Sequence, residues 1–209
     1  MRRRDFIKVI ADSAVAWPLV ARFVVFLALV PAGLLLAKAE PTVHESITYY
    51  DVSGTTAVMV RNHLNSIRPK NERNGISYDA ITRWYVSWRY TYRNGAHGCA
   101  IAEVTTTVDV NITMPRLANE ASTTAELVRM FADYAEKLLV HEKGHGKTGI
   151  DAARRIEDGI RALPSQRSCD EVARTANALG YSLIKEANRL DAEYDIRTQH
   201  GRTQGARFP

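Results

Sequence analysis

The chain has 209 residues, enough for one domain with a substantial core, and it carries a formal charge of +5. Most of that charge lies in residues 1–39, which hold six basic and two acidic residues. The remainder is close to neutral, which excludes the broadly basic surface expected of a nucleic-acid-binding domain.

Residues 1–39 have the pattern of an export signal. A basic head at residues 2–4 precedes an apolar run at residues 23–37, which is short for a membrane span. Residues 37–39 have a small-x-small cleavage pattern, and residues 3–8 resemble a twin-arginine signal. We expect a signal peptide or, alternatively, an uncleaved N-terminal anchor that makes the only membrane contact. Residues 40–209 would then form one exported domain, periplasmic or secreted.

The first half of this domain has the patterns of strands. Residues 47–52 form a short apolar run, and residues 55–67 have helical spacing. Residues 80–93 and 99–113 alternate with period two around a glycine-containing turn, which predicts a long antiparallel hairpin. The arginines of the first segment fall on one face, which we interpret as the hydrated face of a sheet rather than a nucleic-acid platform.

The second half has the patterns of helices. A capping box at residues 123–126 opens a long apolar rhythm that ends before Pro164. Another at residues 168–171 opens a helix that we expect to end near Glu193, and residues 194–209 have no helical pattern. Strands followed by helices predict an α+β fold: an antiparallel sheet with a long hairpin, then two long helices.

The first long helix contains the sequence His141-Glu142-Lys143-Gly144-His145. On a helix, histidines four residues apart project to the same side, where both can bind one Zn²⁺ ion at about 2.0–2.1 Å. Glu142 is then the expected general base that takes a proton from a zinc-activated water. The alternative is a surface helix with polar residues by chance, but His141 and His145 continue the apolar face. Gly144 and Gly146 would allow close approach of substrate or backbone beside the metal.

The third zinc ligand is less well specified. We expect His200, because it lies in a tail whose polar residues have no helical pattern. Asp151 is a rival only if the helix breaks after His145, and its continuing rhythm opposes a break. Glu186 and Glu193 are rivals on the last helix, where a solvated helix face explains them equally well.

Two residues beside His200 have expected supporting roles. Asp195 could orient an imidazole from the second coordination shell. Tyr194 could donate a hydrogen bond to the oxyanion that develops during hydrolysis.

The chain contains two cysteines, Cys99 and Cys169. In an oxidising compartment, an even pair favours one disulfide, here between the second long strand and the last helix. Two unrelated buried thiols would be the better interpretation if the protein stayed in the cytosol. Export and disulfide formation are therefore linked predictions.

Several motifs together resemble a bacterial domain-of-unknown-function family described as predicted secreted zinc-dependent proteases. The matching motifs are "YYDVSG", the strand from Trp84 to Tyr90, Cys99, "MPR", "HEKGHG", Cys169 and the ending "YDIRTQHGRTQGARFP". The resemblance covers nearly all of residues 40–209. It implies a zincin-like active-site helix in a single zinc-dependent protease-like domain, without identifying a substrate.

The functional hypothesis is an exported zinc metallopeptidase that acts on a peptide or protein substrate, with no nucleic-acid partner. A non-catalytic zinc-stabilised binding module is one alternative, and a zinc amidase acting on cell-wall peptides is another. Glu142 favours an enzyme, since a structural zinc site needs no base and usually has four protein ligands.

Overall fold

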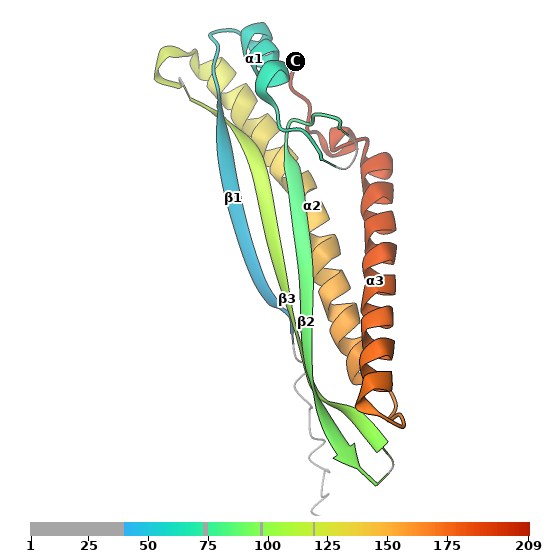
Figure 1. Cartoon of the computed structure of the whole chain (residues 1–209). Helices are drawn as coiled ribbons and strands as arrows, with labels where there is room; N and C mark the ends of the chain where they lie inside the picture. The colour runs from blue at the N-terminus through green and yellow to red at the C-terminus, as the bar shows by residue number, and fades with distance from the viewer. Residues whose placement is uncertain (1–39, 73–74, 97, 119) are drawn as a thin grey trace, which may run out of the picture. The chain divides into compact units, whose positions relative to one another are not determined.

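The computed structural model describes residues 40–72, 75–96, 98–118 and 120–209, and Figure 1 shows its elements in chain order. The expected leader, residues 1–39, lies outside the described residues. The elements are β1 (Thr42–Val52), α1 (Ala57–Ile67), β2 (Ile81–Gly95), β3 (Gly98–Leu117), the 3₁₀ turn η1 (Glu120–Ser122), α2 (Ala125–Arg161), α3 (Cys169–Thr198) and the 3₁₀ turn η2 (Arg202–Gln204). The α+β class is confirmed.

The sheet has the strand order β1-β3-β2. The predicted hairpin is present, because β2 and β3 pair antiparallel over almost their whole length. The sheet is mixed rather than purely antiparallel, since β1 pairs parallel with β3. The chain reverses at α1, so β2 runs opposite to β1. When β3 returns between them, it lies parallel to β1 and antiparallel to β2.

Two strand boundaries differ from the sequence prediction. β1 begins at Thr42 rather than residue 47, and β3 continues through Pro115 to Leu117, because these two strands pair along their full common length. The expected alternation also shifts near the start of β3. A bulge opposite Thr91 and Tyr92 leaves Ala102 exposed and turns Ile101 into the core.

The two long helices lie on the same side of the sheet, with α2 against the strands and α3 beside it (Figure 1). The cap of α2 is Thr124, one residue after the predicted Thr123, and its side chain accepts a hydrogen bond from the Leu127 amide. Ser168 caps α3 as predicted. The helix α2 is continuous through its glycines. At Gly149, a Cβ would lie 2.7 Å from the Trp84 ring, so helix and sheet are in close contact.

The end of α3 corrects the sequence prediction. The helix continues past Glu193 to Thr198, so residues 194–198 are helical rather than irregular. The left-handed residue Gln199 then caps the helix, and its amide donates to the Asp195 carbonyl. The helical continuation places Asp195 one turn after Asp191 on the same helix face.

Two apolar clusters form the core. The larger lies between the sheet, α1, the part of α2 from Leu127 to Ala153 and the C-terminal tail. The smaller lies at the hairpin end, where α2 and α3 join, and includes Ile156, Ile160 and Val172. The predicted Cys99–Cys169 disulfide is present and closes this end. Among the described residues, no helix has the length and apolar composition needed to cross a membrane.

Candidate metal centre

The middle of α2 carries three buried polar residues. His141, Glu142 and His145 are only 3%, 4% and 8% exposed. They continue the buried line of Tyr134 and Leu138, as the helical spacing predicted. Burying three polar side chains is costly unless each has a partner, so the contacts of each side chain determine what this site can bind.

The end of α3 places a carboxylate against both histidines. Asp195 Oδ1 lies 3.2 Å from His141 Nε2 and 3.2 Å from His145 Nε2. The two Nε2 atoms are themselves 3.3 Å apart. Within the part of the chain that the structure describes, His141, His145 and Asp195 form the group whose ligand atoms could hold a metal ion.

The opposite ring nitrogens fix which imidazole atoms are available. His141 Nδ1 lies 2.9 Å from Gln204 Oε1, and His145 Nδ1 lies 2.8 Å from Asp191 Oδ1. Both oxygens are acceptors, so each Nδ1 can donate its proton to them, and each Nε2 faces Asp195 Oδ1. Two ring nitrogens and a carboxylate oxygen therefore meet at one point, where either a shared proton or a metal ion can hold them together.

The spacing of these three atoms fits a zinc ion. Metal–ligand distances of about 2.0–2.1 Å in tetrahedral geometry place neighbouring ligand atoms about 3.3–3.4 Å apart. The three separations of 3.2–3.3 Å are close to that value. Two nitrogens and one carboxylate oxygen are also a usual donor set for zinc. Gln204 and Asp191 would supply the hydrogen bonds that orient liganding histidines.

The electrostatics of the group show how strongly it favours positive charge. Burial alone raises the pKa of Asp195, but hydrogen bonds from His141 and His145 outweigh it and hold that pKa well below its usual range. Burial alone lowers the pKa of His145, but hydrogen bonds to Asp191 and Asp195 reverse the effect and raise it to about 10. A bound cation could supply the positive charge that a proton supplies here.

Glu142 lies beside this group without belonging to it. The Thr82 hydroxyl of β2 donates to Glu142 Oε2 at 2.7 Å and so orients the carboxyl. Burial raises the pKa of Glu142, while the neighbouring histidines and the Thr82 bond act in the opposite direction. The net rise is the direction expected for a carboxylate that accepts a proton during a reaction.

His200 reaches the site but is not one of the three grouped residues. Its Nδ1 lies 3.2 Å from Asp195 Oδ1, and its ring lies 5.2 Å from the ring of Tyr78. The side chain is half exposed and lines the cavity beside the histidines. The arrangement favours Asp195 over His200 as the third ligand. We expected Asp195 in the second coordination shell, but in the structure its carboxylate contacts both histidines of α2, and His200 lies next to it.

Tyr194 contacts both histidines from the side. Its ring stacks on His141 at 5.1 Å, and its hydroxyl donates to the His141 carbonyl at 3.2 Å and accepts from Gln204 at 3.0 Å. It is not among the described residues that line the cavity, so the geometry gives no support to an oxyanion role. A Cβ on Gly144 would lie 2.1 Å from this hydroxyl, while Gly146 packs on the sheet at Val110 instead of the metal group.

The other rival ligands lie outside the group. Asp151 pairs with Lys147 and Arg154 on a continuous helix, as the absence of a break predicted. Glu186 and Glu193 both pair with Arg189 on the exposed side of α3. These partners are exposed to solvent, consistent with the interpretation of a solvated helix face.

Sequence reasoning missed Asp191, Gln204 and Thr82. Asp191 and Asp195 lie four residues apart, which is the helical spacing that would have indicated a shared face. That signal was lost because the helix was expected to end near Glu193. Gln204 and Thr82 carry no comparable sequence signal, since their positions depend on how the tail and β2 pack against α2.

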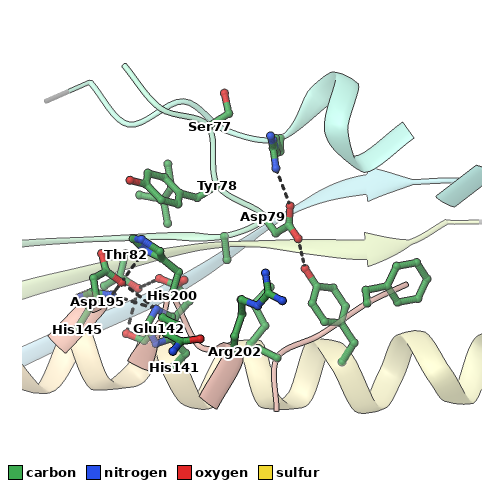
Figure 2. A pocket seen from close by; sticks show the side chains of 18 of the residues that line it. Ser77, Tyr78, Asp79, Thr82, His141, Glu142, His145, Asp195, His200 and Arg202 are labelled. Atoms are coloured by element: carbon green, nitrogen blue, oxygen red, sulfur yellow. Dashed lines mark hydrogen bonds and ion pairs between the residues drawn. The ribbon is translucent and has the colours of Figure 1, made fainter. Parts of the chain in front are cut away.

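The group opens into a cavity of about 490 Å³. Figure 2 shows His141, Glu142, His145 and Asp195 at one part of this cavity, with Asp79 and Arg202 elsewhere on its wall. The cavity is lined by residues of α1, the loop before β2, α2, α3 and the tail. A chain segment or small molecule entering it would reach the histidines and Glu142 together.

Comparisons with known proteins give one match. The family model described as "Bacterial protein of unknown function (DUF922)" matches residues 47–201. The matched segment contains β2, β3, α2 and α3 and every residue of the histidine and aspartate group. Neither the curated proteins nor the solved structures yield a match.

Proposed function

The chain belongs to the bacterial DUF922 family, whose function is unknown, so we propose an activity from the site itself: hydrolysis of peptide bonds by a zinc-dependent peptidase. The observation that carries the proposal is the convergence of His141, His145 and Asp195 beside the buried carboxyl of Glu142. These groups open into one cavity large enough for part of a peptide chain.

The ligands would be His141 Nε2, His145 Nε2 and one Asp195 carboxylate oxygen. Zinc, when bound, supplies Lewis-acid activation of water and of the substrate carbonyl. Gln204 and Asp191 hold the two imidazoles in the tautomer that presents Nε2. His200 contacts Asp195 from the cavity side, where it can orient the carboxylate. Three protein ligands leave a position open, as catalytic rather than structural zinc sites do.

Glu142 would move the proton. Its carboxyl takes a proton from the water that attacks the substrate carbonyl and delivers it to the departing amine. Thr82 holds Oε2, which restricts the carboxyl to one orientation. The cavity wall keeps Glu142 largely away from bulk water, and this burial raises its pKa toward the range useful for a base at neutral pH.

The position of Glu142 also bears on the alternatives. A zinc-stabilised binding module has no use for a buried carboxyl that is not a metal ligand. Burying the Glu142 carboxyl there would only lower the stability of the folded protein. An amidase acting on cell-wall peptides would use the same chemistry, so the substrate must distinguish the two. The disulfide Cys99–Cys169 supports export, since such bonds persist in oxidising compartments.

The test of the proposal is the variant Glu142→Gln. It should keep one zinc per chain but lose about 10²–10⁴-fold in peptide hydrolysis, because it removes a base and no ligand. Glu136→Gln is the matched control, since Glu136 is an exposed carboxylate on the same helix. Turnover would be measured on a mixed proteome digest and on purified cell-wall peptides, with metal content measured on the same samples.

Two outcomes would count against the proposal. Comparable turnover by Glu142→Gln and the parent protein would exclude Glu142 as the base. Stoichiometric zinc with no turnover on either substrate mixture would favour the non-catalytic binding module.

A further inference from the structure

The cavity has a second, cationic part that the proposed reaction does not use. Four arginines line it, Arg61, Arg68, Arg202 and Arg207. Apart from Glu142, Asp191 and Asp195 at the metal group, Asp79 is the one described carboxylate on its wall. Because the chain beyond the leader is nearly neutral, this concentration of arginine is local to the cavity rather than a general property of the surface.

Asp79 pairs with Arg61 through one carboxylate oxygen, while its Oδ1 has no hydrogen-bond partner among the described residues and lies 3.6 Å from Arg68 Nη1, so one carboxylate faces four arginines. Its Oδ2 accepts hydrogen bonds from Arg61 at 2.8 Å and from the Tyr134 hydroxyl at 2.6 Å. Arg61 also donates to the carbonyls of Phe208 and Pro209, so its guanidinium is used to hold the tail. Arg61 and Asp79 therefore form a structural pair at the wall of the cavity.

Arg68 and Arg202 are left with unused donors. The Arg68 Nε is buried and has no hydrogen-bond partner among the described residues, and its Nη1 lies 3.6 Å from Asp79 Oδ1. Leaving a buried donor unpaired is unfavourable, and more so for a charged group. The Arg202 side chain has no hydrogen-bond partner in the described part of the chain, and Figure 2 shows it projecting into the cavity. Arg202 can therefore donate freely to an anionic ligand, and Arg68, although it lies near Asp79, adds positive charge and one unused donor.

The spacing along α2 sets the distance from the histidines. Tyr134, at the Asp79 pair, and His141 lie seven residues apart on one continuous helix, or about 10 Å at 1.5 Å per residue. An extended peptide rises about 3.3 Å per residue, so this distance spans about three residues. Figure 2 shows Arg202 on the wall of the same cavity as Asp79 and the histidines.

We propose that this part of the cavity binds a carboxylate of the substrate, within about three residues of the peptide bond that is cleaved. The inference rests on the proposed peptidase function and specifies its substrate class: an acidic peptide. The carboxylate can belong to a glutamate or aspartate side chain or to the C-terminus of the peptide. The guanidinium of Arg202 would form the main contact, because a planar guanidinium binds a carboxylate through two parallel hydrogen bonds, and Arg68 would add charge from the cavity wall.

The experiment measures binding separately from turnover. The probes are N-acetylated, alanine-based hexapeptides with one glutamate at each position in turn, each paired with its glutamine counterpart and made as a C-terminal acid and as an amide. Their dissociation constants are measured by calorimetry on zinc-loaded Glu142→Gln protein, which does not consume them. At the best position, the acidic peptide should bind about tenfold more tightly than its neutral partner, and added salt should reduce that ratio.

The arginine variants identify the contact. In the Glu142→Gln background, Arg202→Gln should remove most of the tenfold ratio, and the double change with Arg68→Gln should remove the rest. Arg174→Gln is the matched control, because Arg174 is an exposed arginine near the opposite end of α3, and it should preserve the ratio. If only the C-terminal acid and amide forms differ in dissociation constant, the C-terminal carboxylate is the group that binds. If the glutamate and glutamine peptides differ, a side-chain carboxylate is the group that binds.

Equal binding of acidic and neutral peptides would overturn the inference, as would an absence of binding by every peptide. A preference that persists in the double arginine variant would overturn it as well. These results are independent of the peptidase proposal, because an acidic preference in binding can be present in a protein that fails to hydrolyse any peptide.

Discussion

The two ends of the α2–α3 pair differ in what holds the helices together. At the hairpin end, Ile156, Ile160 and Val172 are fully buried, and the Cys99–Cys169 disulfide joins sheet to helix. At the other end, the contacts between the helices are polar, between His141 or His145 and Asp195. One end contributes apolar burial and a covalent link, and the other brings together polar groups that can hold a cation.

This division explains how the polar end can exist. Buried histidines and carboxylates are costly unless a proton or a metal ion compensates their charges. The apolar cluster and the disulfide hold α3 beside α2 independently of that cation. Metal binding can then use a preformed site, and its free energy adds to the stability of the folded state. Substitutions at each end test whether the two ends are independent.

The largest expected effect on stability is at the hairpin end. Replacing both Cys99 and Cys169 with serine should lower the free energy of unfolding by about 2–4 kcal/mol. Without the cross-link, the unfolded chain gains the conformational entropy that the closed loop had removed. Urea denaturation, monitored by circular dichroism, measures the change. Zinc stoichiometry in the folded variant should not change. An unaltered unfolding free energy, with two free thiols in the parent protein, would contradict the account.

Two glycine substitutions test the ends as a matched pair. A Cβ on Gly144 would lie 2.1 Å from the Tyr194 hydroxyl, and one on Gly180 would lie 2.6 Å from the Trp88 ring. Each alanine should therefore cost about 1–3 kcal/mol through overpacking, offset by up to about 1 kcal/mol of helix propensity. Gly144→Ala should also weaken zinc binding, since Tyr194 stacks on His141, while Gly180→Ala should not. The same loss of zinc affinity in both variants would show that the ends are coupled.

A smaller effect is expected from Asp191→Asn. Asp191 holds the Nδ1 proton of His145 without being among the three expected ligands. Removing its charge should lower zinc affinity about 10–100-fold and leave the zinc stoichiometry unchanged at saturation. Competition with a chelator of known affinity measures the change. Asp133→Asn, at an exposed carboxylate on α2, serves as the control and should bind like the parent.

The sequence predicted the buried face of α2 that carries His141, Glu142 and His145, but it did not predict the last turn of α3. His141, Glu142 and His145 lie within five residues of one helix, so local geometry alone places them on one side. The disulfide was also predictable, because only two cysteines exist. The position of Asp195 on α3 was not predicted, because charged residues interrupt the apolar rhythm and the helix was expected to end near Glu193. At a binding site, the inward-facing residues of a helix are polar. Hydrophobic periodicity therefore ends before the helix does, and the predicted helix end comes too early.

The remaining features depend on packing between distant segments. Gln204 reaches His141 because the tail folds back against α2, where Phe208 packs with Phe131. No local pattern in the tail specifies that contact. The parallel pairing of β1 with β3 is similar, since alternation predicts strands but does not specify which neighbour each strand will have.

The central claim is that Asp195, rather than His200, completes the metal site with His141 and His145. Zinc titration into the parent protein, Asp195→Ala and His200→Ala, followed by calorimetry, tests it most directly. The account predicts one zinc per chain for the parent and for His200→Ala, and a loss of affinity of at least about 100-fold for Asp195→Ala. Normal binding by Asp195→Ala, with zinc lost from His200→Ala, would contradict it.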